Sequence, residues 1–246
     1  MLPPFSLIIP AFNEADRISD SLRSTLAYLT TTASESELIV VNDGSTDATS
    51  TIAHEALATA KIETHLLENQ PNRGKGAAVR RGLLAAKRPI ALFCDADLST
   101  PLEEIPKLIE PIANGDVDLA FGSRALDRSL IGHHQPWRRE QGGRVFNLMV
   151  RLGSGLPFWD TQCGFKAFRL DVCRPILEAA RSDGFAFDVE LLYLVHRAGL
   201  RLREIPVRWN HVDGSKMDLV RDSLKMMREV LTLRMRVRTQ NGAPIE

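Results

Sequence analysis

Short apolar runs alternate with helical patterns along the first half of the chain. The runs predict buried strands over four segments, residues 6–10, 38–41, 64–67 and 89–94. Apolar residues spaced three and four apart, together with helix start signals, predict the intervening helices, residues 15–29, 47–60 and 76–86. Because strands that alternate with helices form parallel βαβ units, this half predicts an α/β fold with a parallel sheet.

The second half of the chain is less regular. We expect a strand over 118–121, a Gly-, Arg- and His-rich connection with a helix near 142–152, a helix over 184–199 and a strand over 202–209. A last helix over 217–237 sets apolar residues against arginines and lysines. We therefore predict one domain over residues 1–216, followed by an amphipathic helix and tail over 217–246.

Composition argues against several classes of function. The chain has 246 residues with 31 basic and 31 acidic side chains, whereas proteins that wrap nucleic acid are usually basic, so we expect no nucleic-acid partner. The cysteines, Cys94, Cys163 and Cys173, lack zinc-site spacing and are expected as reduced thiols. No apolar run reaches the roughly 20 residues that span a bilayer, and residues 1–5 do not resemble a signal peptide. We expect a cytoplasmic protein that meets any lipid from the membrane surface.

Three polar clusters directly follow predicted strands, at residues 10–14, 42–45 and 95–97. The carboxyl ends of parallel strands meet at one edge of a sheet, and ligands bind beyond that edge. One ligand at this edge could therefore contact all three loops.

The last cluster holds two carboxylates, Asp95 and Asp97, at the end of a strand. Side chains two residues apart on extended chain point the same way, and carboxylate oxygens suit Mg²⁺ or Mn²⁺ bound together with substrate phosphates. Taken alone, such a pair is more often a solvated turn or a helix cap than a metal site. The basic turn over 72–76 lacks Walker-loop spacing but could help to hold an anion at the start of a helix.

Together these motifs resemble the family 2 inverting glycosyltransferases. The resemblance rests on four segments in order, residues 10–14, 42–47, 72–76 and 95–97. In the second half, residues 122–124, 160–166 and 185–191 resemble the dolichyl-phosphate β-glucosyltransferases and related polyprenyl-phosphate enzymes. The resemblance runs from about Leu7 to Lys216. It implies the Rossmann-like GT-A fold, with a mostly parallel mixed sheet flanked by helices, in which residues 1–123 bind the nucleotide-sugar and residues 124–216 the acceptor.

The resemblance also implies roles for matching positions. Donor-binding residues would be Pro10, Ala11, Asn13, Glu14, Asp43, Arg73 and Lys75. Asp95 would contact the donor, and Asp97 would hold the metal. On the acceptor side, Arg124 would face a phosphate, and Gln162 lies in a matching substrate-binding segment. On the donor side, a late basic loop would place Ser215 and Lys216 on the diphosphate. Relatives that make mannosyl lipid often carry Gln at the position of Ser99, so a third protein ligand to the metal stays open.

The acceptor decides which further residues the reaction needs. A lipid phosphate is already anionic and needs positioning by arginines, which are frequent in the segment over 124–151. A hydroxyl acceptor would instead need a carboxylate base, for which Asp188 is the candidate. On a helix Asp188 and Glu190 lie about 200° apart, so only one can point into the site, and we expect Glu190 on the outer face.

Three functions remain open from the sequence. The first is inverting transfer of a sugar, by resemblance glucose from UDP-glucose rather than a GDP-sugar, to a polyprenyl or dolichyl phosphate. The second is a transferase of the same fold that acts on a sugar or other hydroxyl. The third is a non-catalytic nucleotide-sugar binder or a nucleotidyltransferase. The basic amphipathic helix over 217–238 predicts peripheral contact with the cytoplasmic face of a membrane, and the oligomeric state is open.

Overall fold

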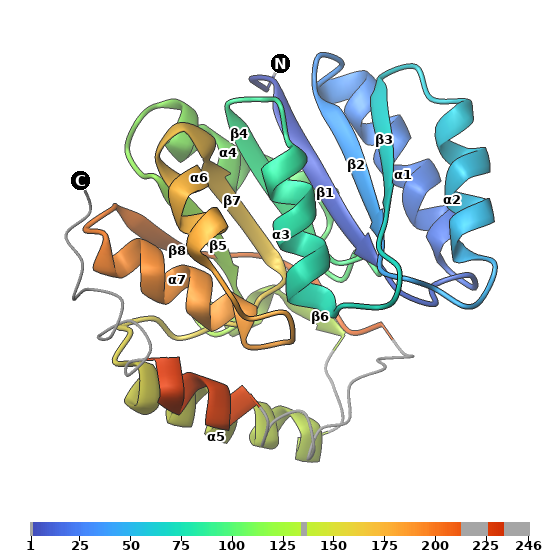
Figure 1. Ribbon diagram of the computed structural model, residues 1–246. Helices are drawn as coiled ribbons and strands as arrows, with labels where there is room; N and C mark the ends of the chain where they lie inside the picture. Colours follow the sequence, from blue (N-terminus) through green and yellow to red (C-terminus); the bar gives the residue numbers. More distant parts are fainter. Residues whose placement is uncertain (1, 134–136, 213–225, 234–246) are drawn as a thin grey trace.

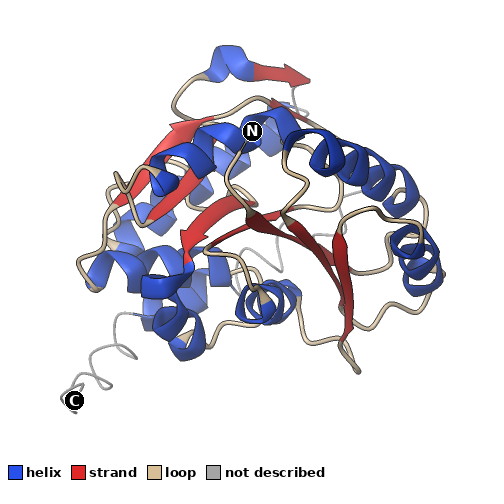
Figure 2. Ribbon diagram, turned by 90° about the horizontal axis from the view of Figure 1, so that it is seen from above, coloured by secondary structure: helices blue, strands red, loops and turns tan. Residues whose placement is uncertain are grey.

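A mixed sheet with helices on both faces forms the body of the protein, here a computed structural model that describes residues 2–133, 137–212 and 226–233 (Figures 1 and 2). Within these residues the main sheet has seven strands in the order β3-β2-β1-β4-β7-β5-β8. Their bounds are β1 (Phe5–Ala11), β2 (Glu37–Asn42), β3 (Glu63–Glu68), β4 (Ile90–Cys94), β5 (Leu119–Ser123), β7 (Phe165–Arg169) and β8 (Leu202–Pro206). Strand β7 runs antiparallel to its neighbours β4 and β5, and the other pairs are parallel.

Two layers of helices cover the sheet, as Figure 2 shows from above. One face carries α1 (Ile18–Thr32), α2 (Thr49–Ala58) and α4 (Ile105–Ala113), and the other carries α3 (Lys75–Ala85), α6 (Leu170–Ala179) and α7 (Phe187–Arg197). Consecutive residues of β1 feed opposite cores, because Ile8 packs with the α3 layer while Leu7 and Ile9 pack with the α1 layer. Strands buried on both faces read as continuous apolar runs, which is why the sequence predicts them.

A smaller helical part lies below the main sheet and its flanking helices in Figure 1. It comprises α5 (Trp137–Ser154) and a helical segment over 226–233, and Val150, Met226 and Val230 join the core of the α3 layer. Two short strands, β6 (Ile131–His133) and β9 (Trp209–Asn210), form a second sheet. Short 3₁₀ turns lie at Leu102–Glu104 and Arg128–Leu130. No helix in the described ranges is long and apolar enough to cross a membrane.

The structure confirms the strands and helices that were predicted in the first half and corrects two predictions in the second. The helix near 142–152 is longer, Trp137–Ser154. The strand expected over 202–209 is broken at Pro206, which cannot donate a ladder hydrogen bond, and Trp209 pairs with β6 instead. Strand β7 and helices α4 and α6 were not predicted. Of the last expected helix, 226–233 is helical, and 217–225 and 234–246 lie outside the described residues.

Candidate functional site

The first two predicted loops are tied to each other at the carboxyl edge of the sheet. Loop 10–14 follows β1, and its Asn13 has the left-handed φ of 54°. The Asn13 side chain accepts a hydrogen bond from the Thr46 backbone N–H at 2.7 Å, and the Glu14 N–H donates to Thr49 Oγ1 at 2.7 Å. Asn13 and Glu14 therefore hold the loop after β1 against residues 46–49, and Pro10 and Ala11 are buried at the end of β1.

Asp43 organises the basic turn that follows β3. Its buried carboxylate accepts hydrogen bonds from the side chains of Asn69 (2.7 Å) and Asn72 (2.9 Å) and from the backbone N–H groups of Arg73 (3.1 Å) and Gly74 (2.7 Å). Four bonds match the acceptor sites of a carboxylate. In this structure Asp43 thus shapes the turn that begins α3, whereas the sequence predicts a contact to the base or ribose.

Lys75 and Asp95 meet directly at the edge. The Lys75 ammonium lies 2.5 Å from Asp95 Oδ1, and the Asp95 carboxylate rests on Gly164, where any added Cβ would overlap it. Burial alone would lower the pKa of Lys75, but Asp95, Asp188 and Asp97 outweigh it and raise the pKa. Lys75 is therefore a fixed cation at the place where the motif carboxylates converge.

Asp95 and Asp97 fit a divalent cation that binds phosphate. Asp97 Oδ1 accepts the Ser99 backbone N–H at 2.9 Å, which closes the turn after β4 and leaves the other oxygen of that carboxylate outside this bond. The Asp95 side chain is 35% exposed, so it is within reach of a ligand. Mg²⁺ and Mn²⁺ sites commonly use one or two carboxylates and complete their shell with phosphate oxygens and water. Ser99 itself is buried, and its carbonyl accepts the Asn210 N–H at 2.8 Å.

Asp188 lies in the first turn of α7 and is buried against a lysine. The Lys166 ammonium, on β7, donates to Asp188 Oδ1 at 2.5 Å and to the Cys163 carbonyl at 2.7 Å. Burial raises the pKa of Asp188 above its ordinary value, although Lys166 and Lys75 act to lower it. The expected outward position of Glu190 is wrong, because Glu190 is 5% exposed and accepts the N–H groups of Arg181 and Ser182.

Arg124 is held by a buried carboxylate. Its guanidinium forms a two-point contact with Asp160, at 2.7 and 2.8 Å, and lies 5.6 Å from the centre of the Trp209 ring. Burial alone would raise the pKa of Asp160, but Arg124 outweighs it and lowers the pKa. Gln162 contacts Met226 Sδ at 2.9 Å, which links this segment to the C-terminal helix. Part of the Arg124 fork is therefore committed within the protein.

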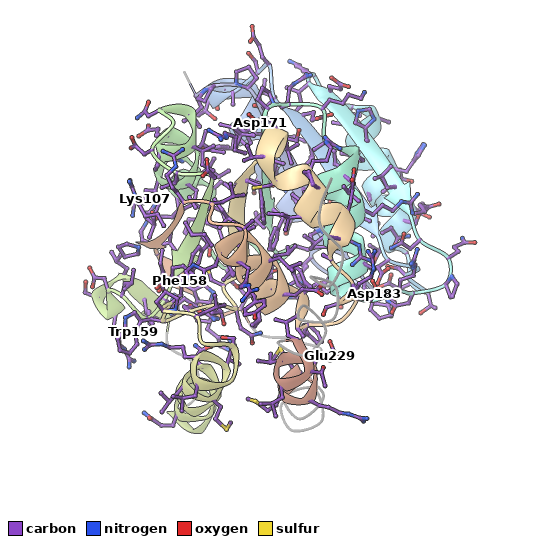
Figure 3. All side chains as sticks on the ribbon, turned by 60° about the vertical axis from the view of Figure 1, so that its left-hand side comes forward. Lys107, Phe158, Trp159, Asp171, Asp183 and Glu229 are labelled. Carbon is purple, nitrogen blue, oxygen red and sulfur yellow. The ribbon has the colours of Figure 1, made fainter. Side chains whose placement is uncertain are left out.

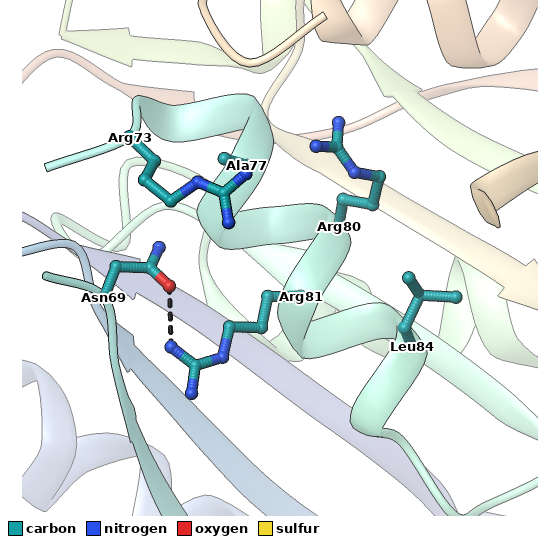
Figure 4. Close-up of a pocket in the computed structure, with 6 residues that line it drawn as sticks. All are labelled: Asn69, Arg73, Ala77, Arg80, Arg81 and Leu84. Atoms are coloured by element: carbon teal, nitrogen blue, oxygen red, sulfur yellow. Dashed lines mark hydrogen bonds between the residues drawn. The ribbon is translucent and has the colours of Figure 1, made fainter. Parts of the chain in front are cut away.

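A shallow hollow of about 330 Å³ lies on the outer side of α3 (Figure 4). It is lined by Asn69, Arg73, Ala77, Arg80, Arg81 and Leu84. Arg80 is paired with Asp183, and Arg81 donates to Asn69 Oδ1 at 2.6 Å, the dashed line in the figure. Of the predicted site residues, Arg73 alone lines this hollow, whereas Lys75 pairs with Asp95.

The structure thus gathers part of the predicted set and adds residues to it. Lys75 contacts Asp95 directly. Asp97 and Asp188 interact with Lys75 through their charges. Ser215 and Lys216 lie outside the described residues. Sequence reasoning missed Lys166 and Asp160 as site residues, although both lie in the segment over 160–166 that carries the family resemblance.

Comparisons with known proteins agree on the family. A model of "Glycosyl transferase family 2" matches residues 6–177. The dolichyl-phosphate beta-glucosyltransferase of Saccharomyces cerevisiae is 34% identical, covering 94% of this chain and 74% of its own, and that of Drosophila melanogaster is 36% identical, covering 93% and 73%.

Solved structures agree on the fold. Mycobacterium tuberculosis glucosyl-3-phosphoglycerate synthase, crystallised with Mn²⁺, UDP and its product, superposes with a TM-score of 0.65 at 22% identity, over 99% of this chain and 82% of that one. Mannosyl-3-phosphoglycerate synthase from Rubrobacter xylanophilus gives 0.68 at 17% identity, over 99% and 76%. The expected GT-A fold is confirmed, and the chain belongs to glycosyl transferase family 2.

Proposed function

We propose that this protein transfers glucose from UDP-glucose to a polyprenyl phosphate, with inversion at the sugar carbon and a divalent cation, Mn²⁺ or Mg²⁺, at Asp95 and Asp97. The observation that carries the proposal is the meeting of Asp95, Asp97 and Lys75 at the carboxyl edge of the sheet. The donor and acceptor classes come from relatives named dolichyl-phosphate beta-glucosyltransferase, 34% and 36% identical over more than nine-tenths of this chain.

The reaction joins an acceptor phosphate oxygen to the sugar carbon as the bond from that carbon to UDP breaks and UDP leaves with the electron pair. When bound, the cation would neutralise the charge that develops on the diphosphate. Lys75 would add a second, fixed positive charge at the same place. Asn13, Glu14 and Asp43 would hold the nucleotide loops in shape, with Pro10 and Ala11 lining the pocket.

The acceptor would enter from the side of residues 124–216. A phosphate acceptor needs to be oriented rather than deprotonated, and arginine suits this task. Arg124 is held in place by Asp160, so it would present a preset charge rather than a mobile one. Gln162 lies on the same segment as Asp160, and Ser215 and Lys216 belong to the predicted loop on the donor side.

A screen of donors and acceptors tests the proposal. UDP-glucose, UDP-galactose, GDP-mannose and GDP-glucose would be paired with a short polyprenyl phosphate, the matching polyprenol and 3-phosphoglycerate, with Mn²⁺, Mg²⁺ or EDTA. We expect UDP release with UDP-glucose and the lipid phosphate, and loss of release in EDTA. Turnover on a hydroxyl acceptor alone would select the second candidate function, and pyrophosphate release would select a nucleotidyltransferase.

We further propose that the acceptor is reached by docking of α5 on an anionic membrane. Leu148, Met149 and Leu152 are 54%, 44% and 74% exposed on one face of α5, while Val150 and Ser154 on the opposite face are buried. Leu231, on the helix over 226–233 that packs against Gly153, is 55% exposed. Figure 3 shows the two helices projecting from the body. The sequence of α5 carries four arginines and one glutamate, which complements an anionic surface.

Vesicle sedimentation tests the docking surface. Leu148→Glu with Leu152→Glu should reduce binding to vesicles of phosphatidylglycerol and phosphatidylcholine about tenfold or more, because two charges must enter the interface. Leu126→Glu, at a residue 43% exposed outside α5, is the matched control and should bind like the parent chain. Equal binding by the double variant and the control would remove α5 from the proposal.

A further inference from the structure

Among the described residues, one lysine is buried at the centre of the sheet, and the proposed reaction gives it no role. Lys166 lies on β7 between Phe93 of β4 and Phe121 of β5 and is fully buried. Its ammonium lies 5.6 Å from the centre of the Phe93 ring. Lysine is almost never fully buried without a partner, and burying a charge is costly. Such a residue calls for an explanation beyond packing.

The two hydrogen-bond partners of Lys166 lie on different segments of the chain beside the candidate site. One hydrogen bond goes to Asp188 Oδ1, in the first turn of α7, and the other goes to the carbonyl of Cys163. Cys163 precedes Gly164, whose backbone supports the Asp95 carboxylate. A single ammonium therefore fixes both the carboxylate on α7 and the turn that backs the metal motif.

The segment before α7 is in turn locked to the start of α3, which carries Lys75. A Cβ added at Gly74 or Gly76 would overlap the backbone of residues 182–184, so the two segments touch. The Ala77 N–H donates to the Asp183 carbonyl at 3.2 Å, and Arg80 pairs with Asp183. Lys75 thus contacts Asp95 directly and interacts electrostatically with Asp188.

We propose that Lys166 is a positioning residue for the transfer reaction. It holds Asp188 and the Cys163–Gly164 turn, which supports Asp95, in place around Lys75. The inference rests on the proposed function, because sugar transfer supplies its assay. Lys166 lies under the motif and acts through Asp188 and the Cys163–Gly164 turn, so it is not a catalytic residue itself.

A double-mutant cycle separates positioning from packing. Lys166→Met should lower kcat/KM about 100-fold, and Asp188→Asn should do the same, because either change removes a charged partner that holds the groups around Lys75 in place. The double variant should be no worse than Asp188→Asn within about threefold, because residues that act as a unit are not additive. Multiplied losses in the double variant would overturn the proposal. If Lys166→Met does not fold, the double variant, in which neither residue is charged, is compared with Asp188→Asn alone. A kcat/KM of the double variant about tenfold or more below that of Asp188→Asn would also overturn the proposal.

The pH profile gives a readout that packing alone would not change. Lys166 lowers the pKa of Asp188, so its removal should move the acid limb of kcat/KM to higher pH by about one unit or more. Asp118→Asn is the matched control. Asp118 is a buried carboxylate paired with Arg169 and Arg201 at the opposite end of β5. The control should lower Tm but leave the acid limb in place, and an unmoved limb in Lys166→Met would refute the inference.

Asp97→Ala, assayed in parallel, keeps the two proposals apart. An inactive Asp97→Ala variant with a Lys166→Met variant that behaves like Asp118→Asn would refute only the role of Lys166. Absence of sugar transfer by the parent chain would refute the proposed function. In that case Mn²⁺-dependent UDP binding, measured by calorimetry, still tests Lys166, because a displaced Cys163–Gly164 turn should weaken it about tenfold and Asp118→Asn should not.

Discussion

Two acidic clusters lie at opposite edges of the same sheet, and they differ in what balances their charge. At the carboxyl edge are Asp95 and Asp97. At the amino edge are Glu37 on β2 and Glu63 and His65 on β3, whose ligand atoms lie within 4.8 Å of one another. Judged by proximity alone, the amino edge is a candidate metal site.

The neighbouring cations reverse that judgement. Lys87 Nζ lies 2.8 Å from Glu63 Oε1, and Arg88 contacts the other oxygen of Glu63 at 2.9 Å. Glu37 Oε1 accepts the Ser6 hydroxyl at 2.6 Å and the Lys87 backbone N–H at 2.7 Å. Glu63 thus pairs with two cations from the same chain, whereas Asp95 pairs with one, Lys75. The comparison teaches that the number of cations already paired with a carboxylate, rather than the proximity of acids, separates the two edges.

The sharpest way to break this comparison is to neutralise one acid at each edge. Asp97→Asn should lower kcat about 10³-fold, because it removes a ligand to the cation that stabilises the leaving diphosphate. Glu63→Gln should stay within about twofold of the parent chain. UDP release with polyprenyl phosphate measures both. A loss in Glu63→Gln as large as that in Asp97→Asn would move the metal to the amino edge.

The two lysines give a second, smaller contrast. Lys75→Met should lower kcat about 10²-fold, since the ammonium beside Asp95 would stabilise the negative charge that develops on the departing diphosphate. Lys87→Met removes an equivalent ammonium beside Glu63 and should leave turnover unchanged. Steady-state kinetics at saturating Mn²⁺ measures both. Equal kcat values for the two variants would show that Lys75 has no part in the chemistry.

Sequence reasoning predicted the first half of the fold because three of its strands, β1, β2 and β4, are buried along their whole length. Residues 38–41 are wholly apolar, and the run leaves no ambiguity. Strand β7 was missed because Phe165–Arg169 is short, carries two basic residues, and neither alternates strictly nor forms a continuous apolar run. Its position between β4 and β5 depends on contacts with residues more than 40 positions away, which no local pattern reports.

The candidate site was predicted in part for the same reason. Asp95 and Asp97 follow a clear strand, so topology alone brings them to the edge. The partners of Asp43 and Arg124 are set by tertiary folding, so the sequence could not tell a ligand contact from an internal hydrogen bond. The same holds for Lys166, because a lysine in a sequence is read as exposed until the fold shows its partner.

The smallest expected effect sharpens the comparison from the amino edge. Lys87 and His65 hold the pKa of Glu63 down to about 2, below its ordinary value of 4.5. A carboxyl whose pKa is lowered by folding contributes stability above its unfolded pKa and loses it as pH falls through the folded value. Glu63→Gln should therefore lower Tm at pH 6 by at most about 3 °C, and this difference should vanish near pH 2.

The amino-edge ion pairs are exposed to solvent, so salt should weaken them. At 1 M NaCl the Tm difference between Glu63→Gln and the parent chain should shrink toward zero, because the Debye length falls to about 3 Å. Glu55→Gln, at an exposed position on α2, is the control for loss of a surface carboxylate. A Tm difference that persists in salt and at pH 2 would mean that Glu63 acts through packing. The charge balance that distinguishes the amino edge from the metal motif would then need another explanation.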